Sequence, residues 1–483
     1  MRRLLAMMIL AMAIGCGGGG GGGSADGTAP EGGAAAGGAA VPTTTVVANN
    51  PAAPTPAAPA AATQADINLR AAMANAGVQV VQAAPAQDAA KVTLGQALMF
   101  DKILSGNMDI SCATCHHPTQ ATGDGLSVSI GTGGSGLGPA RTLGAGRNFI
   151  ARNAPGLFNL APVNPMFHDG RVSRAQGGAF TTPAGGQLPQ GLDNVAAAQA
   201  MFPVTDRDEM RGNAGDTRLD GQPNELAGFA DNDLTNIWAS IMTRLLAIPQ
   251  YQQMFAAAFP GVPQNQLGFQ HAANAIAAFE ISQVEHLDSP FDRYVAGDNS
   301  ALTDAQKRGG QIFYGRGRCS ACHRGGLLSD LTFHNIAAPQ VGPGKGAEAP
   351  LDFGRGRETG QPQDRFRFRT PTLRNVALTG PWMHSGSYTS LQAVVRHYIN
   401  PGQALNNYNP NQLQPQFRSQ VHVTDQLAAG VLNNLDPVLG NPIPLNNGDV
   451  DDLVDFLNAL TDDTSTNLNN LAPASVPSGL PLD

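Results

Sequence analysis

The sequence is poor in charged and aromatic side chains. Of its 483 residues, 14% are charged, 6% are aromatic and two are tryptophan. No run of Lys or Arg occurs and the formal net charge is −8, so nucleic acid is not expected as a partner. Alternating β-branched residues are rare, which argues against a β-sandwich or a β-barrel.

The N-terminal apolar stretch is too short to span a membrane. Two arginines precede the eleven apolar residues 4–14, whereas a bilayer core needs about 20. This arrangement is typical of an export signal. Cys16 follows and resembles the acylated cysteine of a bacterial lipobox, so residues 1–16 are predicted to be a lipoprotein-type signal peptide. Cleavage and release stays open as an alternative, because Ala13 is a weaker match than the usual Leu.

Residues 17–63 form a low-complexity segment that starts with seven glycines and continues with Ala, Gly, Pro and Thr. Such a composition buries too little apolar area to offset chain entropy, which predicts a disordered tether. Behind a lipid anchor, the tether lets the folded part stand off the periplasmic side of a bacterial membrane. Without acylation of Cys16, the protein is expected to be periplasmic and soluble.

The folded part is predicted to be mainly α-helical with long loops. Apolar residues recur at helical spacing in six segments: 92–100, 233–246, 267–284, 304–313, 390–398 and 450–460. The stretches between them are rich in Gly, Pro and Asn, notably 132–150, 175–192, 338–362 and 401–447. A boundary near residue 289 divides the chain into halves, 64–288 and 289–473, followed by a tail, 474–483.

Each half carries one Cys-x-x-Cys-His pentapeptide. The first motif is Cys112-Ala113-Thr114-Cys115-His116 and the second is Cys319-Ser320-Ala321-Cys322-His323. Two thiols three positions apart reach the two vinyl groups of one porphyrin, and the adjacent imidazole then lies beneath the iron, so each motif predicts a covalently bound haem c. A zinc site built from the two pairs leaves both histidines unexplained. A disulfide within a pair closes a tiny, strained loop.

The second axial position of each iron decides the function. An open position permits ligand chemistry, whereas a filled one permits electron transfer. Spacing alone does not choose a ligand among the eight remaining histidines, which are His117, His168, His271, His286, His334, His384, His397 and His422.

The residues around the motifs resemble the diheme cytochrome c peroxidases and the related MauG-type enzymes. The resemblance rests on stretches in the same order along the chain: 94–95, 104–105, 111–116, 152–155, 167–171, 209–210, 289–292, 319–335, 369–375 and 383–386. It implies two cytochrome c-like helical domains, a peroxidatic one at 64–288 and an electron-transfer one at 289–473. The haems are expected on either side of the domain interface.

In the first half, the resemblance implies that His116 is the proximal ligand of the peroxide-reactive iron. Glu209 matches the distal acid/base of the family, Gln199 its distal glutamine and Pro203 a proline of the distal pocket. A carboxylate beside the open face can take a proton from bound peroxide and return it to the leaving oxygen. Without the resemblance, Glu209 reads as a solvated loop carboxylate between two arginines.

The first haem is predicted to be permanently five-coordinate and to need no reductive activation. The position at which classical bacterial peroxidases have a removable distal histidine is Thr132 here. No histidine lies between His117 and His168, and His117 is too near His116 to reach the opposite face.

In the second half, the resemblance implies that His323 is the proximal ligand. The sixth ligand lies fourteen residues after His384; it is Met in the peroxidases and Tyr in the MauG-type enzymes, and here it is Tyr398. A phenolate favours the ferric state, whereas a thioether favours the ferrous state. Tyr398 is therefore the predicted ligand, with Met383 or His397 as alternatives.

Two further assignments come from the resemblance. His168 stands where the family has an electron-carrying Trp, so it either relays charge poorly or only hydrogen-bonds a propionate or the backbone. Asn153, Thr379 and Pro381 match the ligands of an interdomain Ca²⁺, a hard cation that prefers oxygen; ordinary turn residues are the alternative. His384 is expected beside the second haem and not on its iron.

The leading hypothesis is an exported diheme peroxidase that reduces hydrogen peroxide to water. Its electrons would come through the second haem from a small periplasmic cytochrome c or cupredoxin. The alternative is a MauG-like oxidase that takes electrons from residues of a partner protein, and Tyr398 favours that reading. A third is an electron-transfer cytochrome with both irons closed.

Overall fold

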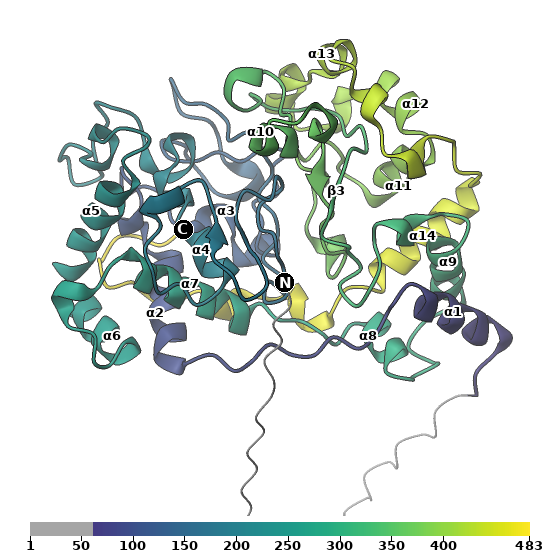
Figure 1. Cartoon of the computed structure of the whole chain (residues 1–483), viewed down its shortest axis with the longest axis horizontal. Coiled ribbons are helices and arrows are strands. Elements are labelled where there is room, and N and C mark those ends of the chain that lie inside the picture. Colours follow the sequence, from purple (N-terminus) through teal and green to yellow (C-terminus); the bar gives the residue numbers. More distant parts are fainter. Residues whose placement is uncertain (1–60) are drawn as a thin grey trace, which may run out of the picture. The chain divides into compact units, whose positions relative to one another are not determined.

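Helices form the frame of the structure, a computed structural model that describes residues 61–483 (Figure 1). Cys16 and the predicted signal peptide lie outside the described residues, as does the tether up to residue 60. The helices are α1 (Gln64–Asn75), α2 (Ala89–Phe100), α3 (Cys112–Cys115), α4 (Val195–Ala200), α5 (Leu234–Leu246), α6 (Pro249–Ala258), α7 (Phe269–Gln283), α8 (Pro290–Val295), α9 (Asp304–Tyr314), α10 (Arg355–Thr359), α11 (Leu391–Ile399), α12 (Pro401–Asn406), α13 (Val423–Ala428) and α14 (Asn447–Asn458).

The mainly helical fold class is confirmed, and each of the six predicted segments coincides with a helix: α2, α5, α7, α9, α11 and α14. Two of the stretches expected to be loops contain short helices: 338–362 contains α10, which has five residues, and 401–447 contains α12 and α13. The last two are only six residues long, too short to show an apolar periodicity. Within residues 61–483, no helix is both long and apolar enough to cross a bilayer.

Extended structure is limited to two short antiparallel pairs in the described part of the chain. β1 (Ser173–Arg174) pairs with β2 (Phe180–Thr181), and β3 (Phe333–His334) pairs with β4 (Phe368–Arg369). The second pair brings the segment that follows the second motif beside the 369–375 stretch, with Phe333 opposite Arg369.

Two helix pairs approach closely in the same way, one in each half of the chain. α2 packs against α7 at Gly95, where a Cβ atom would lie 1.9 Å from the Ala275 carbonyl oxygen. α9 packs against α14 at Gly309, where a Cβ atom would lie 1.9 Å from the Asp452 carbonyl oxygen. Only glycine permits backbones this close. Each glycine precedes a Cys-x-x-Cys-His motif, so each helix pair supports the segment that carries one motif.

The two largest apolar clusters of the described residues each include one of these helix pairs. One cluster runs from Leu94 to Ile281 and the other is built mainly from residues 291–460. Leu69 and Met73 of α1 belong to the second cluster, so the start of the 64–288 segment packs with the later half of the chain. The cysteines Cys112 and Cys319 lie at the edges of the first and second clusters respectively.

The close approach of α2 and α7 gives a stability prediction. We expect Gly95→Ala to lower the free energy of unfolding by about 1–3 kcal/mol or more, because the helices must separate to admit a methyl group. Gly228→Ala is the control, since nothing lies within 4 Å of its Cβ position. Denaturant unfolding of the purified holoprotein measures both, and equal stability of the two variants would contradict the packing argument.

Candidate haem sites

The first motif lies in a short helical turn whose imidazole is held from behind. Cys112 to Cys115 form α3, and the His116 N–H donates to the Cys112 carbonyl at 2.9 Å. Nδ1 of His116 donates to the Thr122 carbonyl at 3.0 Å, and burial lowers the pKa of the imidazole. A neutral imidazole that donates from Nδ1 keeps the Nε2 lone pair for a metal.

The second motif repeats this arrangement. Cys319 begins a 3₁₀ turn, and Nδ1 of His323 donates to the Leu328 carbonyl at 3.0 Å. Burial lowers the pKa of His323 to about 4, so this imidazole is also neutral. In both motif histidines, Nδ1 donates to a backbone carbonyl a few residues further on, so the two rings have the same tautomer.

The cysteine pairs do not meet in a zinc site. All four motif thiols are free of disulfides, and burial raises the pKa of Cys112 and of Cys319 to about 12. Within residues 61–483, the one cluster of His, Cys, Asp or Glu close enough to hold a metal is Cys322, Asp330 and His334, with a single cysteine. A four-cysteine zinc site is therefore not formed by the described residues.

A cavity of about 270 Å³ opens beside the second motif. It gathers residues from distant parts of the sequence, and ten of those that the sequence analysis selected line it: Asn153, His168, Cys319, Cys322, His323, Thr379, Pro381, Met383, His384 and Tyr398. One wall therefore carries two thiols and a neutral imidazole.

Of the alternative sixth ligands, two line this cavity and one does not. Tyr398 comes from α11, and burial raises the pKa of its phenol, with a smaller contribution from the thiols of Cys322 and Cys319. Met383 lines the same cavity. His397 is turned elsewhere, because its Nε2 donates to the Ile336 carbonyl at 2.7 Å and its Nδ1 accepts from the Tyr388 hydroxyl at 2.9 Å.

Arg369 is a cavity residue to which the sequence analysis gave no role. Its Nε donates to the Phe167 carbonyl at 3.3 Å and its Nη1 to the Thr370 carbonyl at 3.1 Å. No carboxylate of the described residues pairs with it, and burial lowers its pKa to about 10. A buried cation without a counter-ion favours an anionic group in the cavity. A porphyrin carries such groups as propionates, so the cavity fits haem in its thiols, its imidazole and its charge.

Glu209 is positioned by a single π-helical turn, Arg207–Arg211. The Asp206 carboxylate caps this turn and accepts from the Glu209 N–H at 3.2 Å. Burial, with a contribution from Asp206, raises the pKa of Glu209 to about 7, and more distant cations oppose the shift. The two flanking arginines do not neutralise it, since both bind Asp231. Glu209 is thus not a solvated loop carboxylate.

The Thr132 position lies against this turn. Its N–H donates to the Glu209 carbonyl at 2.9 Å, and its hydroxyl donates to Asp109 at 2.8 Å. His117 is half-buried, and its Nδ1 is engaged with Thr119. Gln199, on α4, is half-buried and precedes the short 3₁₀ turn that begins at Pro203 and leads to Asp206. Within the described chain, no hydrogen bond joins Gln199 to Glu209.

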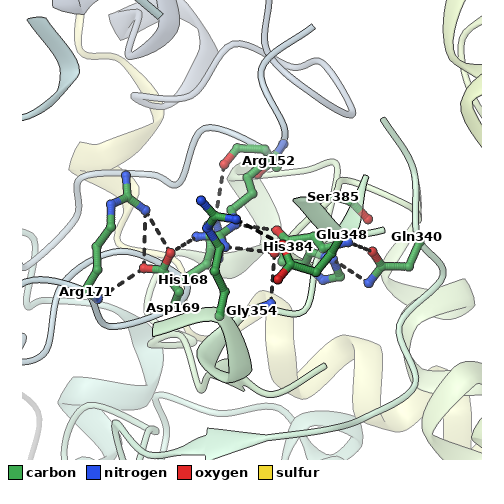
Figure 2. Close-up of polar contacts among 12 residues, drawn as sticks. Arg152, His168, Asp169, Arg171, Gln340, Glu348, Gly354, His384 and Ser385 are labelled. Atoms are coloured by element: carbon green, nitrogen blue, oxygen red, sulfur yellow. Dashed lines mark hydrogen bonds and ion pairs between the residues drawn. The ribbon is translucent and has the colours of Figure 1, made fainter. Parts of the chain in front are cut away.

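A buried ionic network links the 152–171 segment with the 338–362 stretch and with His384 (Figure 2). Arg152 Nη1 contacts Asp169 at 2.5 Å, and its Nε contacts Asp352 at 2.6 Å. Asp169 also pairs with Arg171 at 3.0 Å. On the other side, the Asp352 N–H donates to Gln340, which in turn donates to Nε2 of His384 at 3.2 Å.

The network fixes two of the predicted site residues. Nε2 of His384 accepts from Gln340 and its ring stacks on Phe368 at 3.6 Å, so this ring is held in place beside the cavity. His168 donates from Nε2 to the Asn153 carbonyl at 3.2 Å. Burial, with Arg152 and Arg369, lowers the pKa of His168 to about 4. The backbone hydrogen bond that we considered for His168 is therefore present.

The fold and the paired Cys-x-x-Cys-His turns define a class, the di-haem c-type cytochromes with peroxidase-type sites. The family model for di-haem cytochrome c peroxidase matches residues 89–300. The methylamine utilization protein MauG of Methylorubrum extorquens is 32% identical over 65% of this chain and 69% of its own length. The cytochrome c peroxidase Ccp of Escherichia coli is 31% identical over 67% of this chain and 56% of its own length.

Among solved structures, a MauG-like protein associated with microbial copper homeostasis is 25% identical, with a TM-score of 0.55, over 80% of this chain and 96% of its own. The chain therefore belongs to the di-haem cytochrome c peroxidase family, and it is a peroxidase-type oxidoreductase. The family resemblance expected from the sequence is confirmed.

Proposed function

We propose that this protein is an exported diheme peroxidase that reduces hydrogen peroxide to two water molecules with two electrons and two protons. The observation that carries this proposal is Glu209, a half-buried carboxyl group whose pKa is raised to about 7 and which has no arginine paired to it. A group with a pKa near the working pH both accepts and returns a proton.

Each motif binds one haem c in this proposal. Cys112 and Cys115 form the thioethers of the first haem and Cys319 and Cys322 those of the second. His116 and His323 are the proximal ligands. When bound, the haem supplies an iron that binds peroxide and transfers electrons.

The residues of the first site act on protons. Glu209 takes a proton from one peroxide oxygen and returns it to the other, which leaves as water. Gln199 lines the distal side and orients peroxide by hydrogen bonding. Thr132 holds the Glu209 turn by its backbone and offers no imidazole to close the iron, which favours a five-coordinate first haem without reductive activation.

The residues of the second site hold the electron-transfer haem. Tyr398 is the sixth ligand, with Met383 as the alternative, and both line the cavity beside His323. Arg369 pairs with a propionate, and His384 and His168 support the edge of the cavity through the hydrogen bonds described above. Asn153, Thr379 and Pro381 line the same cavity and supply oxygens for a Ca²⁺.

The remaining proposals concern organisation and partners. The halves 64–288 and 289–473 are two cytochrome c-like domains, each built on its own glycine-mediated helix pair. The protein lies on the periplasmic side of a bacterial membrane, anchored through Cys16 or released. Its electron donor is a small cytochrome c or cupredoxin.

Tyr398 also supports the alternative function, a MauG-like oxidase that draws electrons from residues of a protein substrate. The donor separates the two functions. Steady turnover of peroxide with a reduced small cytochrome or cupredoxin supports the peroxidase, whereas peroxide consumption only in the presence of an oxidisable protein supports the oxidase. Failure of both haems to react with peroxide or cyanide leaves an electron-transfer cytochrome.

The first test changes Glu209 to Gln. We expect the second-order rate of the ferric protein with peroxide to fall by about 10²–10⁴, the range for loss of a general acid–base. In the wild type, the carboxylate is the form that accepts the proton, so the rate rises with pH and levels off above about 7. Stopped-flow absorbance from pH 5 to 9 measures both effects.

Asp208→Asn is the matched control, because Asp208 is the preceding carboxylate in the same turn and accepts a hydrogen bond from Asn148 at its exposed side. We expect it to keep the wild-type rate and pH profile. A Glu209→Gln variant with the same rate and profile as the wild type would remove the basis of the proposed function.

The second test changes Tyr398 to Phe. We expect the ligation of one haem to change from six-coordinate to a different state while the other haem keeps its spectrum, because only one cavity contains this phenol. Electron paramagnetic resonance of the ferric protein resolves the two haems. Tyr408→Phe is the control, since that hydroxyl donates to the Ser387 carbonyl outside the cavity. Unchanged spectra in Tyr398→Phe would return the assignment to Met383.

A further inference from the structure

The last residues of the chain return to the first half and cover the first motif. After α14, the C-terminal segment, residues 461–483, runs back across the first half and ends beside α3 (Figure 1). Leu468, Leu471 and Val476 are buried in a cluster with Met99 and Phe100 of α2. The segment is therefore packed as part of the fold.

Polar contacts fasten the segment at points along its course. Nε2 of Gln96 donates to the Leu471 carbonyl at 3.0 Å. The Ser478 hydroxyl donates to the buried Asp101 at 2.6 Å, and Asp101 also accepts from the Tyr251 hydroxyl at 2.7 Å. These contacts bring the end of the segment to the turn that contains Thr114.

The Asp483 side chain binds the turn of the first motif. One carboxylate oxygen lies 2.7 Å from Nζ of Lys102. The other accepts hydrogen bonds from the Ser111 hydroxyl, at 3.3 Å, and from the Thr114 hydroxyl. Thr114, in the middle of the first motif, is fully buried and also accepts from the Ser111 N–H at 2.9 Å. The three partners of Asp483 are themselves nearly buried.

A four-residue helix does not hold its own position, because forming an isolated helical turn is unfavourable. The position of α3 is therefore set by contacts from outside it, and His116 follows directly at its end. Among the described residues, no carboxylate makes such a contact with the middle of the second motif. Ser320 and Ala321, at the positions of the buried Ala113 and Thr114, are half-exposed and exposed.

We propose that Asp483 is a positioning residue for the first haem. Through Thr114 and Ser111 it fixes the turn that carries the two thiols, and so it sets the position of the His116 imidazole relative to the iron. This inference rests on the proposed attachment of haem to the first motif. The described contacts of Asp483 are with Lys102, Ser111 and Thr114, so it would act on the turn and not on peroxide.

The test compares Asp483→Asn with Asp463→Asn in the holoprotein. Asp463 lies in the same segment and is exposed, so it is a matched control. The readouts are the iron–imidazole stretching band of the ferrous protein by resonance Raman and amide hydrogen exchange of residues 474–483. For Asp483→Asn, we expect the band of one haem to shift or broaden, the other haem to stay unchanged, and exchange to rise about tenfold, the effect of losing a charge-assisted hydrogen bond.

Thr114→Val tests the same contact from the other side, and Thr114→Ser, which keeps the hydroxyl, is expected to restore the wild-type band. Because Asp483 also contacts Lys102 and Ser111, the double variant Asp483→Asn/Thr114→Val is expected to change the band by less than the sum of the two single changes, since the contact that they share is lost once. A wild-type band in both Asp483→Asn and Thr114→Val overturns the inference, as does faster exchange without any spectral change. Absence of covalent haem from the wild type instead overturns the proposed function.

Discussion

One buried guanidinium holds together segments from the two halves of the chain beside the cavity of the second motif. Arg152 lies between Asp169 and Asp352, residues from different halves of the chain, and all three side chains are nearly inaccessible to solvent. The arginine keeps the pKa of each carboxyl group far below its usual range, so the network stays ionised. Loss of one partner from such a group costs about 3–5 kcal/mol, because an uncompensated charge stays buried. The adjacent residue, Asn153, binds the backbone of His384 and lies in the cavity wall.

Burial and neighbouring charge give the carboxyl groups of Asp169 and Asp352 one role and the carboxyl group of Glu209 another. Asp169 and Asp352 contact a cation directly and remain acceptors at any working pH. Glu209 is desolvated without a direct cation, since its flanking arginines are taken up by Asp231, and its pKa is raised to about 7. Separation of carboxyl pKa values by environment is how enzymes assign a structural role to one acid and proton transfer to another. Asp169 and Asp352 therefore stay ionised as structural groups, whereas Glu209 can titrate.

Much of this molecule follows from local sequence patterns. The motifs are contiguous pentapeptides, and the long amphipathic helices α5, α9, α11 and α14 carry a visible periodicity. The family stretches led to Glu209 and to Tyr398, which lines the cavity beside the second motif. Contacts between distant loops could not be found in this way. Arg369 was seen only as part of a family stretch, and its missing counter-ion becomes visible only once the fold surrounds it.

The 338–362 stretch shows why loops were the least predictable part. Its composition of glycine and proline indicates only the absence of a long helix, yet it brings Gln340 and Asp352 to the network around Arg152. Arg152 and Asp352 are 200 positions apart, and a local period carries no information about such a pair. The two motifs are alike because each is a contiguous pentapeptide. Their surroundings differ because they come from other parts of the chain. A Cys-x-x-Cys-His turn sets the two thiols and the adjacent imidazole, whereas the other residues come from remote segments: Tyr398 lines the cavity beside the second motif, and Glu209 lies in the turn against Thr132. The difference between the two sites therefore depends on long-range packing and not on the motifs themselves.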